Sequence, residues 1–315
     1  MICLMEIFRI VKNIRANCFF LFLLAFFSLF SVSCNYGFYP ALFNEESVES
    51  RASSIDLLDE EFFPDVSSFS SPKKYSFVVM TDVHIGNALH DVDTEGFLSW
   101  FEKQMQDEDV TKRPLFALSL GDNADGGHES EYKAFNEFAE SMRAIAKEAG
   151  VPSFRLYSTI GNHDLYNNGW ENFKDMVFPY KSAYRFAEKN SDGSGFSYYV
   201  LDSANGTLGE AQRKALKSAF ESDPNPKLVF THYPLYAGGI TVYIMQDTME
   251  RNFLLTLFQN NNVVRSFEGH AHRTASFEYD SWGEDVSSSF GFDDECRLVT
   301  VDSENLTVTS SIIDF

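Results

Sequence analysis

Cysteine is scarce in this chain, and its spacing argues against two kinds of site. The 315 residues include only Cys3, Cys18, Cys34 and Cys296. No two of them have the spacing of a thiolate metal site, and together they form no disulfide framework. We therefore expect neither a cysteine-based zinc site nor thiol chemistry in this protein.

Positive charge is also scarce. The chain has 25 Lys and Arg against 46 Asp and Glu, a formal net charge of −21. Residues 1–33 contain three basic residues and one acidic residue, Glu6, so their net charge is +2. The remainder of the chain therefore carries −23. Because so acidic a surface repels polyanions, we expect no nucleic-acid binding through a basic groove. A hydrophobic fraction of 44%, with 32 Phe, is ample for a large buried core.

The N-terminus has the pattern of an export signal. A basic stretch, Lys12 to Arg15, precedes an apolar block from Cys18 to Phe30 that is short for a membrane span. The block ends in Ser31-Val32-Ser33-Cys34, which resembles a bacterial lipoprotein processing site, although Ser31 stands where that motif usually carries Leu. We expect removal of residues 1–33 and lipidation of Cys34. An uncleaved anchor and cleavage at another small residue are the alternatives.

The domain organisation follows from composition. Residues 34–71 are rich in Ser and acidic residues without periodicity, which predicts a flexible tether between a membrane and a domain. Residues 72–315 are expected to form that domain. The predicted location is outside the cytoplasm, on a bacterial membrane through the lipid anchor, facing the periplasm or the cell surface.

Five apolar runs in the domain read as strands, and each is followed by polar residues able to bind a metal. The runs are 75–81, 115–120, 154–160, 227–230 and 263–267, and the residues that follow them include Asp82, His84, Asp122, Asn162, His232, His270 and His272. Five of the seven histidines lie in these motifs. A structural histidine is normally isolated, so this clustering favours a metal site.

The local pattern suggests how two of these residues act together. In an extended segment, alternation would place Asp82 and His84 on the same side, where both could reach one ion. The whole set supplies oxygen and nitrogen donors without thiolates, which suits two borderline or hard divalent ions such as Mn, Fe or Zn. Helices are expected over 96–106, 130–149, 208–220 and 243–259, and half-exposed antiparallel strands near the C-terminus.

The five motifs together resemble the calcineurin-like metallophosphoesterase superfamily. Its blocks Asp-x-His, Gly-Asp-x-x-Asp, Gly-Asn-His-Asp, a lone His and Gly-His-x-His all stand here in order, within about residues 74–315. The resemblance implies an α/β fold of two stacked mixed β-sheets flanked by helices, with the site at the carboxyl edge of the strands. It also implies a metal-dependent phosphatase or phosphodiesterase that uses a metal-bridging hydroxide.

The resemblance further implies a role for each matched residue. Asp82, His84, Asp122 and His272 would bind one ion, and Asp122 would bridge to a second ion completed by Asn162, His232 and His270. His163 would protonate the leaving oxygen, with Asp125 orienting its ring, and Asn162 and His163 would also contact substrate. Asp164 is expected to stabilise the loop.

Two departures from the sequence pattern of the superfamily argue against two of its branches. Gly126-Gly127 stands where the protein serine/threonine phosphatases carry Arg-Gly, and the tyrosine ligand of purple acid phosphatases is missing from the second block. The pattern is closer to the cyclic-nucleotide phosphodiesterase-like branch. The predicted substrate is a small phosphomonoester or phosphodiester. A pyrophosphatase acting on nucleotides or lipid headgroups, and a non-catalytic binding lipoprotein with the same fold, are the alternatives.

Overall fold

The computed structural model describes residues 47–66, 73–188, 195–239 and 243–315, all within the unit Glu45–Phe315. Among these residues, no helix combines the length and the apolar composition that a membrane crossing requires. The predicted signal and Cys34 lie outside the described residues.

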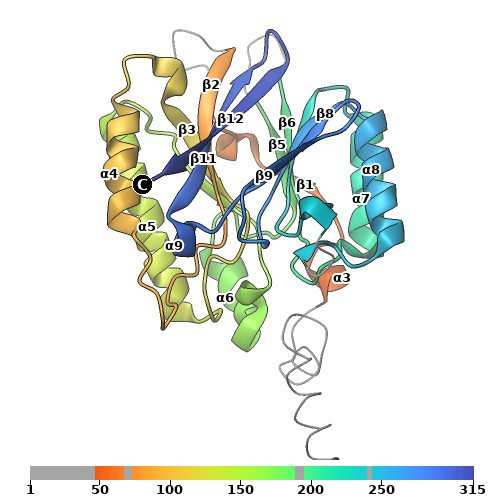
Figure 1. Ribbon diagram of the computed structural model, residues 1–315, viewed down its shortest axis with the longest axis horizontal. Helices are drawn as coiled ribbons and strands as arrows, with labels where there is room; N and C mark the ends of the chain where they lie inside the picture. Colours follow the sequence, from red (N-terminus) through yellow and green to blue (C-terminus); the bar gives the residue numbers. More distant parts are fainter. Residues whose placement is uncertain (1–46, 67–72, 189–194, 240–242) are drawn as a thin grey trace, which may run out of the picture. The chain divides into compact units, whose positions relative to one another are not determined.

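Two mixed β-sheets form the centre of this unit (Figure 1). One sheet has the order β12 (Thr307–Asp314), β11 (Glu295–Asp302), β2 (Lys74–Met80), β3 (Pro114–Ser119) and β4 (Leu156–Ser158). The other has the order β1 (Asp56–Leu57), β5 (Tyr184–Ala187), β6 (Ser197–Val200), β7 (Lys227–Phe230), β8 (Val263–Glu268), β10 (Gly283–Val286) and β9 (Ala275–Glu278). Strands β2–β3–β4 and β6–β7–β8 run parallel within their sheets.

Aromatic side chains fill the space between the two sheets. Phe77 and Phe116 stack at 4.7 Å on one sheet, and Phe230 and Phe267 stack at 5.3 Å on the other. Edge contacts join the layers, such as that between Phe77 and Phe230 at 6.1 Å. All four rings are fully buried. Such rings each remove a large area from water, so the phenylalanine content of the chain provides the core predicted from composition.

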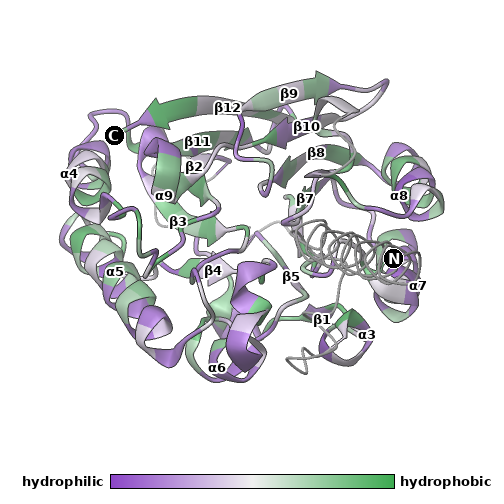
Figure 2. Ribbon diagram, turned by 60° about the horizontal axis from the view of Figure 1, so that its bottom comes forward, coloured by the Kyte–Doolittle hydropathy of each residue, from purple (hydrophilic) through white to green (hydrophobic). Residues whose placement is uncertain are grey.

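Helices cover the outer faces of both sheets (Figures 1 and 2). They are α3 (Val48–Arg51), α4 (Thr94–Met105), α5 (Glu129–Glu148), α6 (Gly169–Met176), α7 (Gly209–Ser222), α8 (Thr248–Asn260) and α9 (Phe290–Asp293), with 3₁₀ turns at Glu60–Phe62, Val110–Lys112, His163–Asn168 and Ala237–Gly239. The predicted αββα sandwich is thus confirmed. Helix α8 begins later than predicted because the Asp247 side chain caps it, accepting from the amide of Met249 at 2.7 Å.

The structure corrects the predicted extent of the tether. Residues 47–66, here called the N-terminal strap, pack on the domain that was expected to begin at residue 72. Strand β1 pairs with β5, and Val48 and Ala52 are buried. The Glu49 carboxylate accepts hydrogen bonds from the first amides of α7, at Glu210 and Ala211. Contacts so distant in sequence leave no periodic pattern, which is why composition suggested a flexible segment.

An ion pair without solvent access fastens the strap. The Arg51 guanidinium donates to both oxygens of Asp202 at 3.0 Å and to Asn205 Oδ1 at 2.8 Å. We expect Arg51→Ala to lower the free energy of unfolding by about 3–5 kcal/mol, because it leaves Asp202 buried without its counter-charge. Urea unfolding of the full chain measures this.

Lys181→Ala is the matched control for Arg51→Ala. Lys181 pairs with Asp56 at 2.6 Å, but both side chains are more than two-fifths exposed, so the loss should stay within about 1 kcal/mol. Equal effects of the two substitutions would contradict a strap held by buried charge.

Candidate metal centre

Five loops carry the predicted metal ligands to one edge of the fold. These loops follow β2, β3 and β4 of one sheet and β7 and β8 of the other. The carboxyl ends of parallel strands meet at a common edge, where α/β sheets bind ligands. Although the motifs are far apart in sequence, their side chains come together here.

The first two loops run side by side beyond the ends of their strands. The amides of Asp82 and His84 donate to the carbonyls of Gly121 and Asp122, at 3.0 and 2.9 Å. Asp82 and His84 have φ of 53°, so this segment is not extended as the alternation argument assumed. Left-handed turns bring the two side chains together instead. Asp122, His270 and His272 also have positive φ, a strained conformation that is concentrated at functional sites.

Two glycines allow the second and third loops to touch. A Cβ on Gly121, where φ is 108°, would lie 2.6 Å from the amide nitrogen of Gly161. A Cβ on Gly161 would lie 2.2 Å from Asp122 Oδ1. Any side chain at either position would therefore push Asp122 away from the other ligands.

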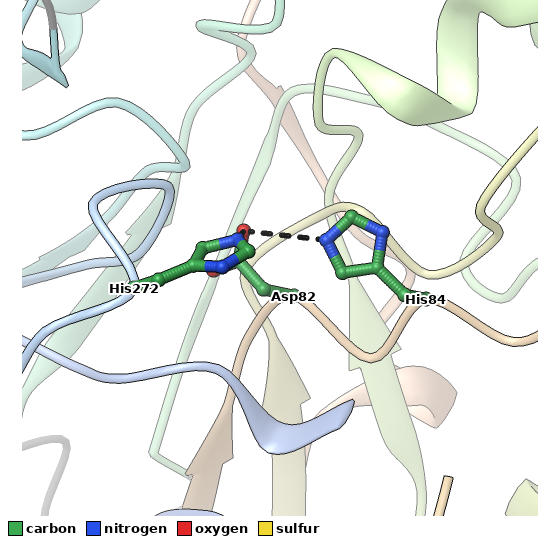
Figure 3. Close-up of side chains that lie close together, drawn as sticks. All are labelled: Asp82, His84 and His272. Atoms are coloured by element: carbon green, nitrogen blue, oxygen red, sulfur yellow. Dashed lines mark hydrogen bonds and ion pairs between the residues drawn. The ribbon is translucent and has the colours of Figure 1, made fainter. Parts of the chain in front are cut away.

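The first cluster comprises Asp82, His84 and His272 (Figure 3). His272 Nε2 lies 3.1 Å and His84 Nε2 lies 4.0 Å from Asp82 Oδ1, with the two imidazoles on either side of the carboxylate. The other oxygen of Asp82 accepts from the His270 amide and from the Thr81 hydroxyl, at 2.9 and 2.7 Å. These bonds hold Oδ1 toward the histidines.

The second cluster comprises Asp122, His232 and His270, with Asn162 beside it. His232 Nε2 lies 3.4 Å from Asp122 Oδ2 and 3.0 Å from Asn162 Oδ1. His232 Nδ1 lies 3.1 Å from the Leu120 carbonyl. Since a carbonyl only accepts, Nδ1 carries a hydrogen, and Nε2, which faces Asp122 and Asn162, is the atom that would bind a metal in place of its proton.

Asp122 joins the two clusters. Its Oδ2 lies 3.8 Å from His84 Nε2 of the first cluster and 3.4 Å from His232 Nε2 of the second. Its Oδ1 accepts from the His163 amide at 2.8 Å, which fixes the carboxylate between them. This is the position that a ligand shared by two ions requires.

The donors suit divalent ions. His84 Nε2 is buried and has no hydrogen-bond partner among the described residues. Such an atom is costly in a dry interior, and coordination of a cation would satisfy it. A third group of possible ligands, His84, Asp125 and His163, contains the predicted acid and its partner, whereas the two clusters above match the predicted ligand sets. The site can hold two divalent ions whose identity is open.

The electrostatics of the site also favour bound positive charge. Burial raises the pKa of Asp122, but His232 and His163 outweigh it and lower the pKa well below its usual range. Burial would lower the pKa of His232, yet the Asp122 carboxylate raises it to about 9. Burial and the neighbouring His232 lower the pKa of His270 to about 3. Buried anionic carboxylates thus attract a cation, while His270 is neutral.

The structure places Asp125 differently from the expectation. Its carboxylate lies 3.1 Å from His84 Nδ1 but 3.8 Å from His163 Nδ1, and it accepts from Asn87 Nδ2 at 2.9 Å. His163 Nδ1 instead lies 2.8 Å from the backbone carbonyl oxygen of Asp125. The side chain of Asp125 therefore orients His84, and its backbone orients His163.

We expect Asp125→Asn to weaken metal binding about 10- to 100-fold. A carboxylate on the far nitrogen of a ligating imidazole fixes its orientation and raises its basicity, and losing it typically costs this much. Titration of apoprotein with Mn²⁺ measures the change. Asp302→Asn is the control, because Asp302 ends β11 beside Lys74 at the start of β2, at the edge opposite the metal centre. Unchanged affinity in Asp125→Asn would contradict the assigned role.

Asp164 stabilises the loop, as expected. Its buried carboxylate accepts from the amides of Asn123, Ala124 and Gly161, at 2.9–3.2 Å, and from the Tyr132 hydroxyl at 3.1 Å. Burial raises its pKa to about 6. Asp164 thus ties the second loop to the third.

Sequence reasoning missed three residues around the centre. The Phe292 ring lies 5.0 Å from that of His84 and 5.4 Å from that of His272, and Tyr233 stacks on His270 at 3.8 Å. Asn87, next to Asp125, is the third. Only Tyr233 carried a signal, because it follows His232 directly. The aromatic residues Phe173 of α6 and Tyr184 and Phe186 of β5 are buried in the core and line no part of the centre.

Comparisons with known proteins agree with this geometry. The family model for calcineurin-like phosphoesterases matches residues 75–274. A relative from Fibrobacter succinogenes, named a probable cyclic nucleotide phosphodiesterase, is 28% identical over 202 residues, which cover 61% of this chain and 71% of the relative.

Solved structures share the fold. A dimetal phosphatase from Danio rerio has a TM-score of 0.54 at 11% identity, over 75% of this chain and 98% of that one. A Plasmodium protein described as the anchor in the inner membrane complex has a TM-score of 0.52 at 15% identity, over 77% of this chain and 89% of that one.

Proposed function

Since this chain belongs to the calcineurin-like phosphoesterase family, we propose that it is an exported, membrane-tethered enzyme that hydrolyses phosphodiester or phosphomonoester bonds. The reaction class is that of the family, the metal-dependent hydrolysis of phosphoric esters. The observation that carries the proposal is the position of Asp122 Oδ2 between His84 and His232.

The ligand assignment follows the two clusters. Asp82, His84, Asp122 and His272 would hold one ion, and Asp122, Asn162, His232 and His270 would hold the other. When bound, two divalent ions supply an activated water and stabilise charge on the phosphoryl oxygens. Asp122 holds the two positions together, and the Asn162 side chain orients both the second position and the substrate.

His163 acts as the acid for the leaving oxygen. Its Nδ1 hydrogen is engaged by the Asp125 carbonyl, so the mobile proton resides on Nε2. Its side chain is 31% exposed, which leaves it open to substrate while the metal ligands around it are mostly buried. A positioned histidine of this kind transfers a proton to a departing alkoxide.

A phosphodiester is the favoured substrate. The relative from Fibrobacter succinogenes is named a probable cyclic nucleotide phosphodiesterase, and the segment from Gly121 to Tyr132 together with His232-Tyr233-Pro234 resembles that branch. The test compares p-nitrophenyl phosphate, bis-p-nitrophenyl phosphate and cyclic AMP with Mn²⁺, Zn²⁺ or chelator. It uses the full chain, because a protein starting at residue 72 would lack the N-terminal strap.

Chelator-sensitive cleavage of the diesters would support the phosphodiesterase proposal. Cleavage of the monoester alone would assign a phosphatase instead. No turnover with either metal would overturn the catalytic proposal in favour of a binding protein.

Export and tethering rest on the N-terminal sequence. Basic residues, a short apolar block and small residues before Cys34 support a lipid-modified N-terminus. Cys34→Ser should move the protein from the membrane fraction to the soluble fraction, and mass spectrometry should find acyl chains on Cys34 only in the parent protein. An unmodified Cys34 in membrane-bound protein would refute lipidation at this residue.

A further inference from the structure

The described chain begins at the same edge of the fold as the metal centre. Residue 47 leads into α3, whose Glu49 caps the start of α7, and Arg51 pairs with Asp202 directly after β6. Strand β6 runs parallel to β7, which leads into the His232 loop. The N-terminal strap is therefore fastened at the carboxyl ends of the strands, and Figure 1 shows α3 at the same end as α9.

Exposed apolar side chains gather on the loops of this edge. Leu89, in the His84 loop, is 97% exposed, and Met249, in the first turn of α8, is 77% exposed. Tyr236, Tyr243 and Phe292 are exposed as well. These five are most of the nine large apolar side chains that are exposed among the described residues. Apolar side chains gathered beside a site mark an interaction surface.

The length of the chain between Cys34 and the N-terminal strap limits how far the metal edge can lie from a lipid anchor. Twelve residues separate Cys34 from Ser47, and a fully extended chain of that length spans about 45 Å. The tether therefore joins the domain at the metal edge, and a lipid on Cys34 would bring this edge to the bilayer without the chain having to pass around the domain. The net charge of −23 beyond residue 33 offers no attraction to anionic lipid, so apolar contact is the means of docking.

We propose that the metal edge faces the membrane and that the substrate is a phosphodiester in a phospholipid headgroup. This inference rests on the export and tethering proposed above. Leu89 and its apolar neighbours insert among the headgroups, and the two-cluster centre meets headgroup phosphate at the lipid surface.

The first test measures orientation. The full lipidated chain is bound to phosphatidylcholine vesicles containing nitroxide-headgroup lipid, with a fluorophore on Leu89→Cys or on Leu306→Cys. Leu306 is 52% exposed and lies in the β11–β12 hairpin, at the opposite edge. We expect quenching several-fold stronger at position 89. Equal or reversed quenching on vesicle-bound protein would overturn the orientation alone, whereas failure to sediment with vesicles would overturn the tether and this inference with it.

The second test measures substrate class. Leu89→Asp should lower hydrolysis of vesicle-borne phosphatidyl-p-nitrophenol about tenfold, while the rate on soluble bis-p-nitrophenyl phosphate stays unchanged. Leu306→Asp should change neither rate. Equal rates of Leu89→Asp and parent protein on the vesicle substrate would refute docking through Leu89, and cleavage of the soluble ester alone by the parent would refute a lipid substrate. Neither outcome would affect the proposed phosphoesterase activity.

Discussion

Replacing Asp122 by Asn should abolish most of the activity, with a loss in kcat/KM of at least about a thousandfold. Losses near this size follow the removal of one group that stabilises transition-state charge, and Asp122 serves both metal positions. One of its oxygens lies between His84 and His232, and the other accepts from the His163 amide. An amide there would remove the negative charge between the two metal positions and replace one carboxylate oxygen by an NH₂ group, which does not bind a metal.

The same variant should bind fewer metal ions. Elemental analysis of protein purified with Mn²⁺ should find close to two ions per chain in the parent and about one or fewer in Asp122→Asn. Circular dichroism checks that the fold survives, and Asp109→Asn, at an exposed acid that caps a short 3₁₀ turn, should leave activity and metal content unchanged. Full turnover in Asp122→Asn would refute the proposed dimetal mechanism.

His163→Gln should lower the rate by an amount that depends on the leaving group. General acid catalysis contributes about 10²- to 10⁴-fold. Because p-nitrophenolate departs without protonation, the loss should be small for bis-p-nitrophenyl phosphate. For a diester with an alkoxide leaving group it should approach the upper end of that range. Measuring kcat for both substrates separates the acid role from a purely structural one.

Two controls make the His163 result specific. Metal content should stay at the parent value, because His163 belongs to neither the Asp82 nor the Asp122 ligand set. His128→Gln tests an exposed histidine near the second motif, whose ring lies 3.4 Å from Asn167 Nδ2, and it should leave both rates intact. An equal loss for good and poor leaving groups in His163→Gln would contradict proton donation.

The sequence alone predicted the elements whose cause is local. Buried strands such as β2 and β3 are continuous apolar runs, and glycine at the strand ends marks the turns that follow. The helix predicted over 130–149 corresponds to α5, on which Tyr132, Phe135 and Phe138 are buried at helical spacing. The motif order was enough to identify the family, and the matched residues are those that the structure brings together.

Only the tertiary structure decided features that depend on contacts between distant segments. The strap joins the domain through Arg51 and Asp202, which are 151 residues apart. The Asp125 carboxylate lies against His84 and Asn87, and Phe292 reaches the centre from an element near the C-terminus. Positive φ at the ligands arises where the loops pack on one another. Composition and periodicity describe each segment by itself, whereas these features exist only once the chain has brought its segments together.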